Sequence, residues 1–241
     1  MSKISLKHSG GNVVSLNSPT SAPTSADVAF KLPNQDGSAN EVLKTDGSGN
    51  LSFGAVTDTN DYVKLLDVSG SNLGAKVVID NLDTTTYKYF DFVGTLQPTN
   101  DSSYLLMRYR TGGASGADYA TSDYNSGINY IVPNSSGYFF TAASAAEWAI
   151  STEVGNHASE AISITMRIGM AESGDPTPMQ WFRNFATWGG SYRDHANAVR
   201  HISGAGHVYN TSVVPTGFTF FFNGGNGHVA AYDYSVYGIK R

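Results

Sequence analysis

Strict alternation of apolar and polar residues constrains this chain most, and it is clearest in residues 161–169. Every second position there is apolar, and these positions hold Ile162, Ile164, Met166 and Ile168. Successive side chains of a β-strand point to opposite faces, so this spacing places all four on one face of a strand. The stretch therefore predicts a strand with one face in a core and the other toward solvent.

Further stretches of the same character follow between residue 58 and the end of the chain. They are rich in β-branched and aromatic residues and are separated by turn residues; they cover 76–79, 87–93, 103–110, 180–186, 218–222 and 232–239. One short helix is expected from Ala142 to Ile150. About six to nine strands with turns between them are typical of a sandwich. We therefore predict an all-β chain with a jelly-roll-like β-sandwich over residues 58–241.

Residues 1–57 differ from the rest of the chain. Their apolar residues come in short runs, separated by a Pro/Ser/Thr stretch at 18–25 and by glycine-rich turns. Leu43–Thr45 and Leu51–Phe53 flank an Asp-Gly turn and predict a hairpin. A segment so poor in apolar bulk cannot close a core alone. We expect residues 1–57 to be an attachment and oligomerisation segment that packs on other copies of itself.

The hairpin turn also resembles the start of a calcium-binding loop. Asp46, Ser48 and Asn50 have the alternating spacing of such a loop. However, Leu51 stands where the loop requires glycine, and no glutamate follows at the twelfth position. A plain hairpin turn is therefore the better prediction.

Composition excludes several classes of function. Only 15% of residues are charged, against about 25% in ordinary soluble domains, and the formal net charge is −5 with no basic patch. Nucleic acid is therefore not an expected partner. The chain has no cysteine, which excludes disulfides, thiolate catalysis and cysteine zinc sites. No apolar stretch approaches the length of a membrane span, and residues 1–20 lack a signal-peptide core. We therefore expect that the protein is not inserted into a membrane and that it is synthesised without being secreted.

Two stretches resemble structural proteins of phage particles. The sequence Leu-Lys-Thr-Asp-Gly-Ser-Gly-Asn-Leu, within residues 30–53, resembles a hairpin segment common in tail-fibre proteins. The ending Asp-Tyr-Ser-Val-Tyr-Gly-Ile-Lys at 233–240, together with the stretches 87–93 and 105–110, resembles a β-sandwich domain that recurs in virion proteins of marine phages such as cyanophages.

The resemblance implies a virion protein that is made in the host cytoplasm. It implies a homotrimeric tail fibre or spike subunit, attached to other virion proteins through residues 1–57, with the sandwich turned outward to the host surface and its glycans. It supplies no catalytic residue and no cofactor. A capsid decoration or head-fibre protein is one alternative, and a carbohydrate-binding module or glycan-degrading enzyme of a cell is another.

Catalytic motifs are absent from the sequence. It contains neither the Gly-x-Ser-x-Gly elbow, nor a P-loop, nor a zincin helix motif. A carboxylate pair for glycan cleavage would have to come from five candidates, which are Glu147, Glu153, Glu160, Glu172 and Asp175. Exposed turn carboxylates are the better interpretation of these residues in a chain with so few charges. We therefore expect a non-enzymatic protein.

Three histidines recur at an interval of six residues. A continuous strand would place His195, His201 and His207 on one face, where histidines of three subunits could converge on a metal ion. Gly204 and Gly206 interrupt the run, so ordinary polar histidines are expected and no metal ligand is assigned.

Aromatic residues near glycine and asparagine are the remaining signal. Aromatic ring faces stack on the C–H faces of sugars, and neighbouring polar groups bond to sugar hydroxyls. Trp181 is expected in the core, whereas Trp188 precedes two glycines and is therefore expected in a surface loop. Trp188, Tyr192 and Tyr124 are therefore the predicted glycan contacts.

Overall fold

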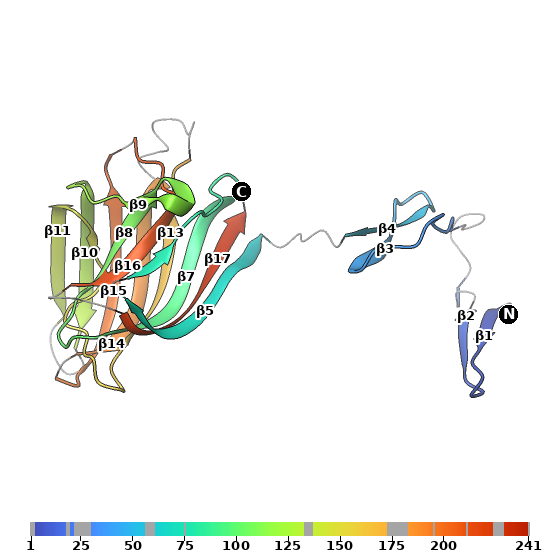
Figure 1. Cartoon of the computed structure of the whole chain (residues 1–241), viewed down its shortest axis with the longest axis horizontal. Helices are drawn as coiled ribbons and strands as arrows, with labels where there is room; N and C mark the ends of the chain where they lie inside the picture. The colour runs from blue at the N-terminus through green and yellow to red at the C-terminus, as the bar shows by residue number, and fades with distance from the viewer. Residues whose placement is uncertain are drawn as a thin grey trace. The chain divides into compact units, whose positions relative to one another are not determined.

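The computed structural model divides the chain into two compact units, residues 1–59 and 60–241 (Figure 1). It describes residues 3–17, 20–21, 30–55, 61–74, 76–132, 137–172, 183–194, 196–210, 212–223 and 229–240. Within these ranges, no helix is both long enough and apolar enough to cross a membrane.

The second unit is a β-sandwich, as predicted, and its larger layer is an antiparallel sheet of eight strands. From one edge to the other, the strand order is β11-β10-β15-β14-β13-β7-β17-β5 (Figure 1). The strands are β5 (Tyr62–Gly74), β7 (Tyr87–Pro98), β10 (Tyr124–Ile131), β11 (Tyr138–Ala145), β13 (Ile162–Gly169), β14 (Phe185–Arg193), β15 (Val199–Val208) and β17 (Val229–Lys240).

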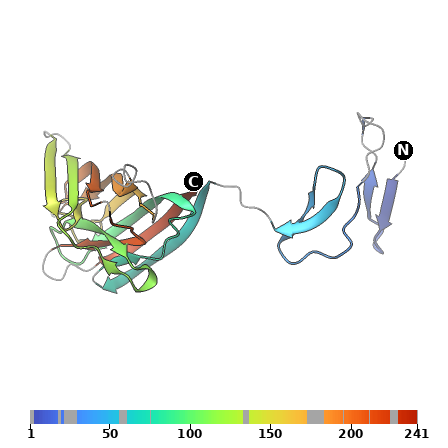
Figure 2. The same cartoon turned by 90° about the horizontal axis from the view of Figure 1, so that it is seen from above.

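The smaller layer follows the order β12-β8-β16-β6, with β9 paired to β8. Its strands are β6 (Val77–Ile79), β8 (Leu105–Thr111), β9 (Ala117–Asp118), β12 (Trp148–Ala149) and β16 (Gly217–Phe222). A single 3-10 turn, η1 (Gly113–Ser115), joins β8 to β9. The larger sheet is curled, and the view from above shows it curving beside the smaller one (Figure 2).

Aromatic side chains fill the space between the two sheets. Phe92 of the larger sheet lies 4.6 Å from Phe220 and 6.5 Å from Phe218, ring centre to ring centre, and both partners belong to β16. Tyr234 of β17 stacks on the same ring at 5.3 Å. These phenylalanines are fully buried, so β16 is fixed against the middle of the larger sheet.

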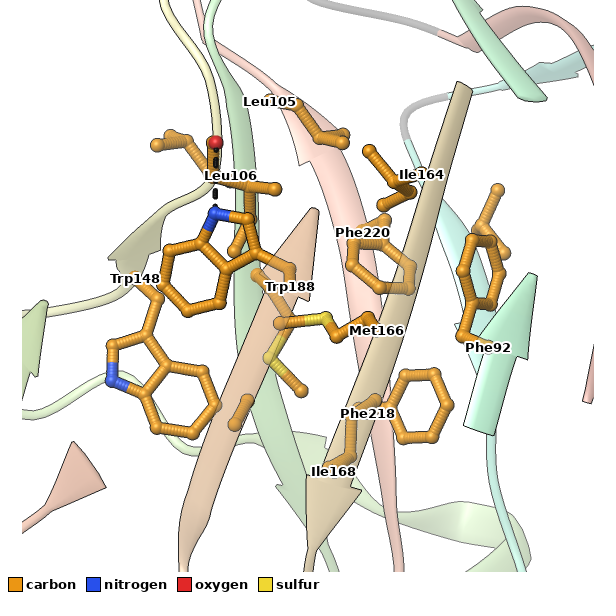
Figure 3. Close-up of a cluster of buried hydrophobic side chains, with 14 of the residues drawn as sticks. Phe92, Leu105, Leu106, Trp148, Ile164, Met166, Ile168, Trp188, Phe218 and Phe220 are labelled. Atoms are coloured by element: carbon orange, nitrogen blue, oxygen red, sulfur yellow. Dashed lines mark hydrogen bonds between the residues drawn. The ribbon is translucent and has the colours of Figure 1, made fainter. Parts of the chain in front are cut away.

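Two tryptophans complete the core at the other side (Figure 3). The indole nitrogen of Trp188 donates to the carbonyl of Ile150 at 3.2 Å, and that of Trp148 donates to the carbonyl of His207 at 3.3 Å. Both rings lie against β15, where a Cβ on Gly204 would be 2.4 Å from the Trp188 ring and a Cβ on Gly206 would be 2.7 Å from the Trp148 ring. Only glycine leaves room for a ring at such a distance from the backbone.

The strand predictions are largely confirmed. β13 contains the alternating stretch, and its four apolar side chains are buried. β6, β7, β8, β16 and β17 contain the predicted stretches near their expected bounds. Residues 180–182 of the stretch 180–186, with Trp181 among them, lie outside the described residues, and its last two residues begin β14. β5, β10 and β15 were not predicted, because polar residues and glycines obscure their alternation.

The predicted helix from Ala142 to Ile150 is wrong. Its first residues belong to β11, which pairs with β10, and Trp148 and Ala149 form β12, which pairs with β8. Alanines favour a helix only weakly when no partner is present. Here the pairing with β10 and the burial of Trp148 decide the structure.

The first unit contains two hairpins. β3 (Glu41–Thr45) and β4 (Leu51–Ala55) form the predicted one, and β1 (Lys3–Lys7) and β2 (Val13–Asn17) form a second that was not predicted. The Asp46 carboxylate accepts hydrogen bonds from the backbone N–H groups of Ser48 and Asn50 at 2.7 and 3.1 Å, which confirms an ordinary turn. No described residue of this unit is buried. The described residues of this unit therefore form no core in a single chain.

The core packing gives a first prediction. Phe92→Ala is expected to lower the free energy of unfolding by about 3–5 kcal/mol, because it empties a site bordered by three rings. Urea denaturation of the variant and the parent measures this loss. The adjacent Val93 is 41% exposed. Val93→Ala is therefore the control, with an expected change within about 0.5 kcal/mol. Equal losses for the two variants would contradict the assigned strand faces.

Candidate functional site

The outer face of the eight-stranded sheet is not covered by the smaller sheet, and its outward residues form a row across all eight strands. The register of the sheet places these residues side by side, in the order Thr141, Gly127, Ala205, Thr187, Arg167, Asp91, Tyr237 and Lys64. The first four are small. Neighbouring strands lie about 4.8 Å apart, so the first six residues of the row span about 24 Å.

Two hollows lie along this row because the side chains there are small. The first has a volume of about 460 Å³ and crosses β11, β10, β15 and β14 over Gly127, Ala205 and Thr187. The second has a volume of about 360 Å³ and is lined by Asp91, Thr165, Arg167, Thr187, Trp188 and Gly189. They adjoin at Thr187, and each has the size of a small-molecule site.

An ion pair borders the second hollow. Arg167 Nε and Nη2 donate to the two carboxylate oxygens of Asp91, each at 2.8 Å. This fork-to-fork geometry fixes the planes of both groups. The Asp91 side chain is 10% exposed and that of Arg167 is 49% exposed. Hydrogen bonding to Asp91 raises the pKa of Arg167, so the pair stays charged but has no net charge.

Two tyrosines flank the pair on its other side. Tyr62 of β5 stacks on Tyr237 of β17, with ring centres 4.8 Å apart and planes 14° apart. The Tyr62 residue is 47% exposed. Burial, and then the Asp91 carboxylate, raise the pKa of Tyr62, so its hydroxyl keeps its proton at neutral pH. The row therefore offers small pockets, a fixed donor–acceptor pair and an aromatic platform.

The residues predicted as glycan contacts lie in the interior. Trp188 is 5% exposed, Tyr192 is 2% exposed and Tyr124 is fully buried. This corrects the prediction, because a buried ring has no free face for a sugar. Trp188 is not a loop residue: β14 continues through it, and alternation turns its ring inward and Gly189 outward.

The polar atoms of the two buried tyrosines are also engaged inside the protein. The Tyr124 hydroxyl donates to the Tyr119 carbonyl at 2.8 Å and accepts from the Tyr109 N–H at 2.9 Å. The Tyr192 hydroxyl bonds to that of Thr152 at 2.7 Å. Burial raises the pKa of Tyr192 and of Tyr124, which keeps both phenols neutral. Both residues therefore stabilise the fold.

The histidine run is only partly described. His201 and His207 are exposed on the same face of β15, which continues through Gly204 and Gly206, so the predicted interruption is wrong. Six residues of a strand span about 20 Å, too far for one metal ion to bind both within one chain. His195 lies outside the described residues. In the described ranges, no three acidic, histidine or cysteine side chains gather as metal ligands.

None of the described candidate carboxylates lines either hollow. Among the residues that line the two hollows, Asp91 is the single carboxylate. Asp175 lies outside the described residues. Glu160 is buried, not exposed as expected, and accepts a hydrogen bond from the His157 N–H at 2.9 Å. The others form ion pairs: Glu147 with Arg108 at 2.7 Å, Glu153 with Arg200 at 3.2 Å and Glu172 with Arg183 at 3.8 Å.

A second polar cluster closes the turn between β14 and β15. The buried Asp194 carboxylate accepts from the backbone N–H groups of Ala196 and Ala198 at 3.0 and 2.8 Å and from Arg200 Nε at 2.7 Å. Arg200 also lies over the Tyr130 ring, 5.4 Å from its centre. Burial alone would raise the pKa of Asp194, but the hydrogen bonds from Ala198 and Arg200 lower it below its ordinary value. The cluster is internally bonded and therefore stabilises the turn.

Comparisons with protein-family models, with curated proteins and with solved structures find no match to this chain. The function is therefore argued from the geometry.

The turn cluster gives a prediction for pH dependence. A lowered pKa in the folded state means that ionised Asp194 stabilises the fold above its unfolded pKa of about 3.9, and that this contribution is lost as the pH falls below that value. Asp194→Asn is expected to cost about 1–3 kcal/mol at pH 7. The difference between parent and variant should shrink at pH 3. Urea titrations at the two pH values measure it, and a constant difference would contradict the assignment.

The ion pair on the outer face gives another prediction. Arg167→Ala leaves the mostly buried Asp91 without its partner and is expected to cost about 1–3 kcal/mol, near the lower end because solvent screens the half-exposed Arg167. Adding Asp91→Ala should recover part of this loss in a double-mutant cycle. The exposed Lys64–Asp67 pair at 3.0 Å is the control and should show no measurable coupling. Additive losses at Asp91 and Arg167 would contradict the prediction.

Proposed function

We propose that this chain is a structural, non-enzymatic subunit of a phage particle, a short tail fibre or spike that assembles as a homotrimer through its first unit. The outer face of the sandwich would then contact the host surface. The protein would be made in the host cytoplasm and built into the virion. The observation that carries this proposal is the exposure of apolar side chains in the described part of the first unit.

Each hairpin of the first unit leaves a pair of apolar side chains exposed, although Gly37 lies against the Phe53 ring of the second hairpin. In the first hairpin, Ile4 pairs with Leu16, and these residues are 66% and 73% exposed. In the second, Leu43 pairs with Phe53, and they are 51% and 42% exposed. Burial of apolar surface contributes about 25 cal/mol per Å². Other copies of the same hairpins would supply that burial most simply.

The second unit supports an outward, multivalent role. Its exposed face carries small polar residues, shallow hollows and paired charges, which suit weak contacts with an uncharged surface. Three copies on one axis would add such contacts together, because the later binding events become intramolecular. The resemblance of residues 30–53 and 233–240 to phage fibre and virion proteins supports the same proposal.

A capsid decoration or head-fibre protein is the second candidate, and the edge strand β11 favours it. This strand contains neither a charged residue nor proline, which are the usual protections of an exposed edge. Tyr138, Phe139 and Phe140 are 50%, 67% and 40% exposed on it. An edge of this kind suits pairing with a neighbouring virion protein.

The mass in solution tests the assembly. Light scattering of the full chain is expected to give three times the chain mass of 25.7 kDa, and residues 60–241 alone should give a monomer. The variant Leu43→Ser/Phe53→Ser should shift the full chain toward monomer, because it removes the apolar face of one hairpin. Lys44→Ser, on the opposite face, is the matched control. A monomeric full chain would overturn the proposed homotrimer and leave the decoration protein as the better proposal.

A further inference from the structure

We infer that the second hollow, beside the Arg167–Asp91 pair, binds one uncharged sugar unit of a glycan. The inference rests on the proposed function, because it names the ligand class of the face that would meet the host surface. It depends on the shape of the hollow, on its hydrogen-bonding groups and on its charge.

The hydrogen-bonding groups match neighbouring hydroxyls of a sugar. A carboxylate has about four acceptor positions, and at Asp91 two bond to Arg167 and one to the Tyr62 hydroxyl, which leaves one. A guanidinium has five N–H donors, of which Asp91 receives two from Arg167. The hydroxyls of Thr165 and Thr187 form no hydrogen bond with the described part of the protein. A sugar hydroxyl both donates and accepts, so it can bridge such a mixed set. The pair is held in place before binding, which lowers the entropic cost of ordering the site.

The charge of the hollow favours a neutral ligand. The positive charge of Arg167 is already compensated by Asp91 at 2.8 Å. An anionic sugar would gain little from this guanidinium and would meet the Asp91 carboxylate. Farther along the row, Lys64 is likewise paired, with Asp67 at 3.0 Å. A neutral sugar avoids this repulsion, and the paired charges still bond to its hydroxyls.

The surroundings of the hollow suit a chain of sugars. Gly189 forms part of its floor, and a Cβ there would meet nothing closer than the Ile202 carbonyl at 3.8 Å. Through Thr187 it adjoins the first hollow, so a second unit could lie over Gly127 and Ala205. In the opposite direction the row leads past Asp91 to the exposed Tyr62 ring, which offers an apolar face for sugar C–H groups.

Filling the hollow from its floor tests the inference without breaking the ion pair. Gly189→Val places a side chain in the hollow, and the open space above Gly189 and the extended strand conformation both permit it. The fold is expected to persist, since valine favours a strand. Ser163→Val, on the same face of β13 but outside the hollow, is the matched control.

The measurement is a nuclear magnetic resonance titration of the full chain with the methyl glycosides of glucose, galactose and mannose, and with methyl glucuronide as the anionic probe. At least one neutral glycoside should shift the Arg167 Nε–H and the Thr187 and Gly189 amide signals in a saturable way. Gly189→Val should weaken this binding at least about tenfold, and Ser163→Val should not change it. The glucuronide should bind more weakly than the glucoside.

Three results would overturn the inference: no neutral glycoside shifts these signals, Gly189→Val binds as well as the parent, or the glucuronide binds more tightly. These results are independent of the assembly. A monomeric chain that binds the glycoside would refute the proposed homotrimer and leave the sugar site. A trimer that binds none would refute the sugar site and leave the assembly.

Discussion

The contact between the curled eight-stranded sheet and the short strand β16 holds the second unit together. Phe218 and Phe220 from β16 meet Phe92, and Tyr234 stacks on the same ring. One small sheet thereby covers the inner face of a much wider one. Trp188 of the larger sheet and Trp148 of β12 in the smaller one add further bulk to the core over the glycines of β15 (Figure 3). Large side chains therefore fill the space on the inner face of the eight-stranded sheet.

Because the core lies on the inner face of the larger sheet, the outer face is left free of packing requirements. The same strands that place Trp188 inward place Gly189 and Thr187 outward, since neighbours along a strand point to opposite faces. Small residues on neighbouring strands then produce the hollows, and a bidentate ion pair fixes one end of them. The packing of the core on the inner face thus determines where a ligand could bind, because the sheet is open to a ligand only on its outer face.

The sequence allowed the β-sandwich, the alternating strand at 162–169 and the hairpin at 41–55 to be predicted, because each depends on local periodicity or turn chemistry. It did not allow the candidate site to be predicted. Asp91 and Arg167 lie 76 positions apart and meet only through the pairing of β7 with β13. The Trp-Gly-Gly sequence at 188–190 was interpreted as a loop, although the glycines belong to a strand: a Cβ on Gly190 would lie 2.2 Å from the Ser163 carbonyl. Register and close backbone approach of this kind are properties of the pairing and are invisible in one sequence.

The two units differ in a way that connects assembly with binding. The second unit buries most of its large apolar residues and presents a face of paired charges, whereas the first exposes apolar residues such as Leu16 and Leu32, at 73% and 79%. A shallow hollow that bonds a neutral sugar through a few groups can bind only weakly on its own, because much of the ligand surface stays in water. Weak sites serve attachment only when several are held together. An exposed apolar segment in the same chain is the feature that would gather them, so the exposure of the first unit and the shallowness of the second are best explained together.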